Sequence, residues 1–174
     1  ITDNESAPTV TLATSATSIA ENAGSSLTLT ATLSVATTAD VTVGISTSGT
    51  GTEGTDYSNI SDITISAGAT TGTASFTPTD DSVYEGNETG IVAISTVSGG
   101  SATEDGTQSV TITITENDSS PTITLATSAT SIAENAGSSL TLTATSSIVA
   151  DEDITVTIGT GGGGTEGTDY STIS

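Results

Sequence analysis

Hydrophobic residues alternate with threonine or serine along most of the chain. Residues 27–33 read LTLTATL and residues 110–114 read VTITI. This period of two is typical of strands with one buried face, and no stretch shows the period of a helix. Seven such runs precede residue 116, at 10–12 (with Ile19 close behind), 27–33, 41–45, 60–65, 74–76, 92–94 and 110–114. The pattern predicts an all-β fold, a seven-stranded antiparallel immunoglobulin-like β-sandwich.

The pattern returns almost unchanged after 113 residues. Residues 8–32 and 121–145 match at 24 of 25 positions, and TEGTDYS occurs around both Tyr57 and Tyr170. A period of 113 is the size of one small domain. We therefore expect a linker from a preceding repeat at 1–7, a complete domain at 8–120, and the first half of a second, near-identical domain, with four strands, at 121–174.

A half-domain alone would expose a sheet face and unpaired strand edges. The simplest interpretation is that the sequence is a window from a longer tandem array. The alternative is that strands from other copies of the chain complete the half-domain within a filament.

The charge excludes several classes of function. The chain has 21 Asp and Glu, no Lys, Arg, His or Cys, and a net charge of −21. Binding to nucleic acid needs cations that neutralise phosphates, and an anionic membrane repels such a surface. Catalysis by His or Cys is impossible, and no apolar run is long enough to span a bilayer. We predict no enzymatic activity, no nucleic-acid partner and no membrane insertion.

The acidic residues gather in alternate loops of the predicted sandwich. The loops after the first, third and fifth strands, and the exit from the last strand, share one end of such a fold. Nine of the fifteen carboxylates up to residue 118 fall there, an end that we call the acidic pole: Glu21, Glu53, Asp56, Asp80, Asp81, Glu85, Glu88, Glu116 and Asp118.

Carboxylates at such a pole repel one another, by about 3 kcal/mol for a pair about 5 Å apart at an effective dielectric of 20. No side-chain cation relieves this repulsion. Calcium accepts six to eight oxygen ligands in irregular geometry, whereas magnesium demands octahedral order. The pole therefore predicts bound calcium; the alternative is a set of solvated acidic loops.

At these residues the chain resembles the Calx-beta family. The matching motifs are IAENAG at 19–24, GTGTEGTDY at 49–57, DDSVYEGNE at 80–88 and the acidic exit at 116–118. The resemblance implies a seven-stranded sandwich and a calcium cluster. The implied ligands are Glu21, Asp56, Asp80, Asp81, Glu85, Glu88, Glu116 and Asp118, with an incomplete second set at Glu134 and Asp169.

The chain departs from the family pattern at four positions. Ser48 and Ser82 replace acidic residues, and Asn117 separates the two acids of the exit. Gly90 stands where the family has an aromatic residue, and we expect it to thin the core beneath that strand.

Together these features predict a structural calcium-binding module in an extracellular tandem array, as the stalk of a microbial adhesin or as a filament. Its partners would be neighbouring repeats or other copies in a filament. Millimolar calcium outside cells suits weak sites, so we expect a secreted or surface protein. The alternatives are an adhesion module that binds a glycan or protein, and a calcium-sensing regulatory domain.

Overall fold

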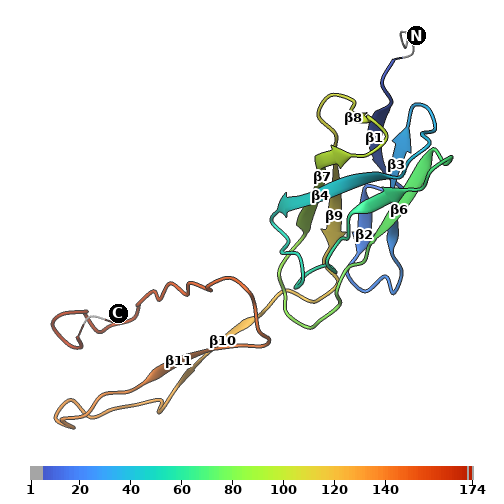
Figure 1. Cartoon of the computed structure of the whole chain (residues 1–174). Coiled ribbons are helices and arrows are strands. Elements are labelled where there is room, and N and C mark those ends of the chain that lie inside the picture. Colours follow the sequence, from blue (N-terminus) through green and yellow to red (C-terminus); the bar gives the residue numbers. More distant parts are fainter. Residues whose placement is uncertain (1–5, 172, 174) are drawn as a thin grey trace. The chain divides into compact units, whose positions relative to one another are not determined.

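The computed structural model describes residues 6–171 and 173. The chain forms two compact units, Ile1–Asp118 and Ser119–Ser174, which we call unit 1 and unit 2 (Figure 1). Within the described residues, no helix is long and apolar enough to cross a lipid bilayer.

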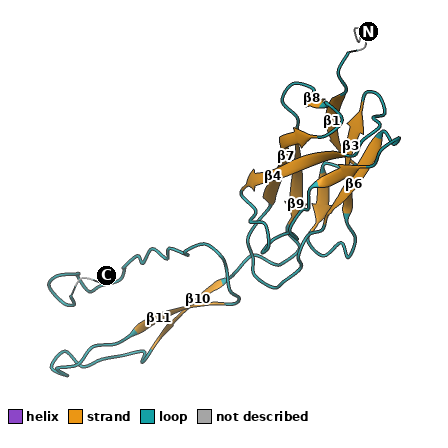
Figure 2. Cartoon of the chain, viewed as in Figure 1, coloured by secondary structure: helices purple, strands orange, loops and turns teal. Residues whose placement is uncertain are grey.

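Unit 1 is a β-sandwich of two sheets (Figure 2). One sheet has the strand order β6-β3-β1-β8 and the other has the order β2-β9-β7-β4-β5. The all-β sandwich predicted from the alternation is thus confirmed. Its strands are β1 (Thr9–Thr14), β2 (Ser18–Ala20), β3 (Leu27–Leu33), β4 (Val41–Gly49), β5 (Ile63–Ile65), β6 (Thr71–Phe76), β7 (Glu88–Ser98), β8 (Thr103–Glu104) and β9 (Ser109–Thr115).

The described part of unit 1 has nine strands where seven were predicted. The run near residue 10 and the residue Ile19 belong to two strands in different sheets, since β1 pairs with β3 and β2 pairs with β9. The two-residue strand β8 was not predicted. The β1–β8 and β2–β9 pairs are parallel, so the sandwich is antiparallel except at these two edges.

The crossing from β1 to β2 positions the acidic pole. The strand β2 runs parallel to β9, and both end with Ala20 opposite Thr115. The Glu21 N–H then donates to the Thr115 carbonyl at 3.0 Å. Glu21 therefore lies beside the chain as it leaves β9.

The core lies between the sheets and consists of the alternating apolar residues. In β3, Leu29, Ala31 and Leu33 are buried, whereas Thr28 and Thr32 are exposed. Such burial is worth about 1.5–3 kcal/mol for each large aliphatic side chain. The alternating apolar residues therefore mark the strands and, once buried, stabilise the sandwich.

Gly90 does not thin the core as expected. The Tyr57 and Phe76 rings stack with centroids 4.6 Å apart, and a Cβ atom at Gly90 would lie 2.7 Å from Phe76 Cε2. The phenyl ring thus occupies the space above the glycine. The Phe76 ring of β6 therefore fills the core beside Gly90.

Unit 2 repeats the first hairpin of unit 1. Its strands are β10 (Ile123–Thr127) and β11 (Leu142–Ser146), and Ile123 pairs with Ser146 as Val10 pairs with Leu33. These are the only strands in its described residues, where the sequence analysis expected four. In unit 1, β2 pairs with β9 and β4 with β7, and the described residues of unit 2 contain no counterparts of β7 and β9.

Candidate metal centre

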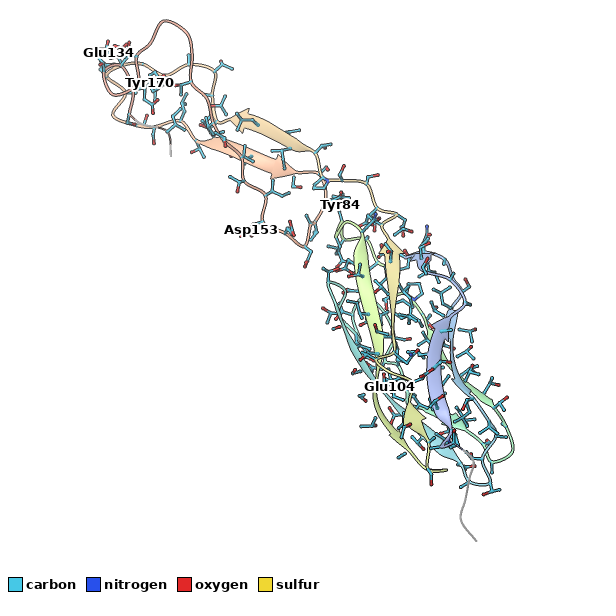
Figure 3. All side chains as sticks on the ribbon, turned by 90° about the horizontal axis from the view of Figure 1, so that it is seen from above. Tyr84, Glu104, Glu134, Asp153 and Tyr170 are labelled. Carbon is cyan, nitrogen blue, oxygen red and sulfur yellow. The ribbon has the colours of Figure 1, made fainter. Side chains whose placement is uncertain are left out.

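The acidic pole is one end of unit 1, where loops from several elements meet. It comprises the turn after β2, the β4–β5 connection, the β6–β7 connection and the residues after β9 (Figure 2). Figure 3 labels Tyr84 in the β6–β7 connection at this end, while Glu104 of β8 lies toward the other end. Because β8 pairs with the start of β1, its carboxylate is far along the sandwich from the pole.

Six of the eight predicted ligands form two groups within the pole. Glu21, Glu116 and Asp118 each place a carboxylate oxygen within 4.8 Å of the others, and we call them the Glu21 cluster. Asp56, Glu85 and Glu88 do the same and form the Asp56 cluster. Residues up to 97 positions apart in the sequence are thus brought together by the fold.

Asp80 and Asp81 lie beside the Glu21 cluster without belonging to either group. The Asp81 N–H donates to Glu21 Oε1 at 3.2 Å, while Asp81 Oδ1 accepts from Val83 N–H at 2.7 Å. The negative charges of Asp80 and Asp81 help to raise the pKa of Asp118. Both aspartates therefore add negative charge beside the cluster, and Asp81 also holds the β6–β7 connection against Glu21.

Glu116 joins the residues that follow β9 to the β6–β7 connection. Its Oε2 accepts from the N–H groups of Glu85 at 2.7 Å and Gly86 at 2.9 Å, and its Oε1 accepts from Asp118 N–H at 2.7 Å. Burial would raise the pKa of Glu116, but these N–H groups and that of Asn117 together lower it. Hydrogen bonds to the charged form thus outweigh desolvation, and Glu116 is ionised at neutral pH.

Glu21 is the most buried member of the pole, with 6% of its surface exposed. Burial raises the pKa of its carboxyl from 4.5 to about 7. The Asp81 N–H opposes this shift, and the charges of Glu116 and Asp81 add to it. Without a cation, the Glu21 side chain therefore holds a proton for much of the time near neutral pH.

Asp118 carries the one buried side-chain N or O atom of the described residues that lacks a hydrogen-bond partner, Oδ2. Burial raises the pKa of this carboxyl, and the nearby charges of Glu116, Asp80 and Asp81 raise it further. A buried carboxylate oxygen without a donor is costly. Such an atom beside two other carboxylates fits the coordination needs of a cation.

The β4–β5 connection presents Asp56 to the second cluster. The Thr52 N–H donates to Asp56 Oδ2, and the Asp56 N–H donates back to the Thr52 carbonyl at 2.9 Å. Tyr57 directs its ring into the core, where it stacks on Phe76. The connection is thereby fastened on one side by the core and on the other by its own backbone.

Three polar residues have roles that the sequence did not reveal. Glu53 belongs to neither cluster, because its oxygens accept from Thr47 Oγ1 and Ile60 N–H. Asn87 Oδ1 accepts from Glu116 N–H at 3.0 Å, and Asn117 Oδ1 accepts from Asn22 N–H at 3.1 Å. The asparagine that interrupts the acidic exit therefore fastens the turn after β2 to that exit.

In unit 2 the predicted partial site has two residues, Glu134 and Asp169. Figure 3 shows Glu134 and Tyr170, the neighbour of Asp169, toward one end of the unit and Asp153 toward the other. The Thr165 N–H donates to Asp169 Oδ2 at 2.7 Å, as Thr52 does to Asp56. Among its described residues, unit 2 contains no group of three carboxylates as close as those of unit 1.

The two clusters of unit 1 offer oxygen ligands with negative charge. Hard divalent cations such as calcium and magnesium prefer such ligands, whereas transition metals prefer nitrogen or sulfur. The chain has no Lys, Arg or His that would otherwise compensate the charge. The arrangement is therefore suited to hold hard cations.

Comparison with known proteins places unit 1 among related domains. The family model of the Calx-beta domain matches residues 3–118. A crystal structure of the apo-form Calx CBD1 domain aligns with a TM-score of 0.52 at 18% identity, covering 63% of this chain and 99% of that one. CBD12 from CALX1.2 aligns with a TM-score of 0.50 at 18% identity, covering 58% of this chain and 42% of that one. A search of curated proteins found no match. The structural likeness shows a shared fold, and the resemblance seen in the motifs is confirmed.

Proposed function

This chain belongs to the Calx-beta family, and we propose that its acidic pole binds calcium and thereby makes unit 1 a structural module of an extracellular tandem array. The observation that carries the proposal is Asp118 Oδ2, a buried oxygen without a hydrogen bond inside the Glu21 cluster. The raised pKa of Glu21 supports the same conclusion, because its buried carboxylate is costly to ionise without a positive charge nearby.

The two clusters have complementary roles in this proposal. Bound calcium would supply the positive charge that no side chain of the protein provides. Glu21, Glu116 and Asp118 would hold an ion that joins the turn after β2 to the exit from β9. Asp56, Glu85 and Glu88 would hold another that joins the β4–β5 and β6–β7 connections. The loops of the pole would then be cross-linked at the end of the sandwich.

Calcium is favoured over magnesium by the chemistry of these groups. The clusters combine carboxylates from separate loops, whose spacing is irregular, and calcium tolerates irregular shells of six to eight oxygens. Magnesium keeps much of its water and needs a near-ideal octahedron.

Isothermal titration calorimetry on the full chain, stripped with a chelator, tests the proposal. We expect calcium to bind with a Kd of about 10⁻⁴–10⁻³ M, as in extracellular modules, and magnesium to bind more weakly. The E116Q variant removes a cluster charge, and the matched D105N variant removes one charge from an exposed turn at the other end of unit 1. Calcium binding that is absent, or equal in E116Q and D105N, would contradict the proposal.

The near-identity of the two copies supports the array. Residues 8–32 and 121–145 differ at one position, as expected for units that repeat one mechanical role. A calcium sensor and an adhesion module are the competing functions. Submicromolar affinity with a change in shape, measured by calorimetry and small-angle X-ray scattering, would favour sensing. Weak affinity with stiffening would favour the stalk.

A further inference from the structure

Glu53 lies at the acidic pole but is placed outside both clusters. Its Oε1 accepts from Ile60 N–H at 2.6 Å and its Oε2 accepts from Thr47 Oγ1 at 2.7 Å. Thr47 is in β4 and Ile60 precedes β5, so the carboxylate joins the two ends of the connection between these strands. The segment between them contains Asp56.

We infer that Glu53 is a positioning residue, which holds the 52–57 turn closed so that Asp56 is placed for the Asp56 cluster before an ion arrives. This inference rests on the proposed calcium function and extends it. A carboxylate suits the task because it accepts hydrogen bonds at both oxygens, and here two donors converge on it from different parts of the chain.

Unit 2 provides an independent copy of this arrangement. Glu166 Oε1 accepts from Ile173 N–H at 3.1 Å, and Glu166 Oε2 accepts from Thr160 Oγ1 at 3.3 Å. The turn itself is also repeated: Gly54 N–H donates to the Tyr57 carbonyl at 2.7 Å, as Gly167 N–H does to that of Tyr170.

This second turn keeps its form without the surroundings of the first. Tyr57 stacks on Phe76 and bridges to Pro78, but the described residues of unit 2 contain no equivalent of β6. The conformation is therefore encoded in the local sequence and its two glutamate contacts. A turn held in this way presents its aspartate without ordering cost at the time of binding, which raises affinity.

Two conservative substitutions separate positioning from simple charge. In E53Q the amide Oε1 still accepts from Ile60 N–H, and its NH₂ group can donate to the Thr47 hydroxyl, so both contacts persist while the charge is lost. In E53D the charge persists, but the side chain is one methylene shorter and cannot reach both donors. Positioning and charge therefore predict opposite rankings of the two variants.

The experiment is calcium titration of the full chain by calorimetry. We expect E53D to lose about 10-fold or more in affinity, as when a group that orients a metal ligand is removed. We expect E53Q to stay within about threefold of the wild type because it keeps both contacts. The charge control D105N should stay in the same range because its charge is distant from the pole and screened.

The outcomes are distinct. Wild-type protein that binds no calcium would overturn both the proposed function and this inference. Wild-type binding with E53D unchanged, or with E53Q weakened more than E53D, would overturn the inference about Glu53 and leave the calcium function standing. Circular dichroism and thermal melting of each variant in the presence of chelator verify that the fold is kept.

Discussion

Replacing Glu21 should change the stability of unit 1 in opposite directions with and without calcium. Its carboxyl is buried and its pKa is about 7 in the folded protein, against 4.5 for an unperturbed glutamate. The folded state therefore binds a proton more tightly than the unfolded state. The stability that this proton contributes is complete below pH 4.5 and is lost as the pH rises through 7.

The magnitude follows from the pKa shift. A shift of one pKa unit corresponds to about 1.4 kcal/mol, so ionising Glu21 costs roughly 3 kcal/mol in all, and most of this cost falls between pH 5 and pH 8. Asp118 acts in the same direction because its pKa is also raised. Glu116 acts in the opposite direction, but its lowered pKa places that effect below pH 5. Metal-free protein should thus melt on the order of 10 °C lower at pH 8 than at pH 5.

The E21Q variant mimics the protonated side chain. The amide oxygen can still accept from Asp81 N–H, and the NH₂ group can donate to Glu116, as the protonated carboxyl does. In chelator at pH 8 we expect E21Q to be more stable than the wild type by about 2–3 kcal/mol, with little difference at pH 5. In calcium the order should reverse, because the variant has lost a ligand of the Glu21 cluster.

Urea denaturation of the wild type and of E21Q at pH 5 and pH 8, with chelator and with calcium, measures the free energy of unfolding in each condition. If the stability of the wild type in chelator does not change between these pH values, Glu21 is not buried as described. An E21Q variant that is less stable than the wild type in chelator at pH 8 would refute the view that the ionised carboxyl is a burden there.

Four other substitutions test the packing of the two units and one contact of the pole. The G90A variant places a Cβ 2.7 Å from the Phe76 ring, and urea denaturation should show a loss of about 1–3 kcal/mol; no loss would mean that the ring does not fill this space. Leu12 is 7% exposed and Leu125 is 55% exposed within the same local sequence. L12A should therefore lower the free energy of unfolding by about 2–5 kcal/mol, and L125A by less than about 0.5 kcal/mol. Equal losses would show that both leucines are packed. The N117A variant removes the acceptor of the Asn22 N–H and should weaken calcium binding, measured by calorimetry, on the order of 10-fold. An unchanged Kd would show that this hydrogen bond does not position the ligands.

The sequence predicted most strands of unit 1 and the end at which the acids meet, because both depend on regular geometry. Alternation decides which face of a strand is buried, and strand order decides at which end a loop emerges. It did not predict the division between β1 and β2, since residues 15–17 contain neither Gly nor Pro to mark the crossing.

The internal arrangement of the pole depends on loop conformation, which residue type alone does not encode. Glu53 and Asp56 lie three positions apart in one loop, yet Asp56 belongs to a cluster whereas Glu53 accepts hydrogen bonds from Thr47 and Ile60. Asn117 looked like a gap in an acidic series, but it supplies the acceptor for Asn22 N–H. The division of the carboxylates into two clusters could be seen only once their loops had been placed.

The central claim is that the acidic pole of unit 1 packs closely because divalent cations neutralise it. The most direct test is thermal melting of the full chain at pH 7.5 and physiological salt, in chelator, in calcium and in magnesium. The account predicts that calcium at 100 times its Kd stabilises the unit by about 2.7 kcal/mol for each site that it fills, with a clear rise in Tm, and that magnesium at the same concentration does much less. A Tm that is the same in chelator and in calcium would contradict it.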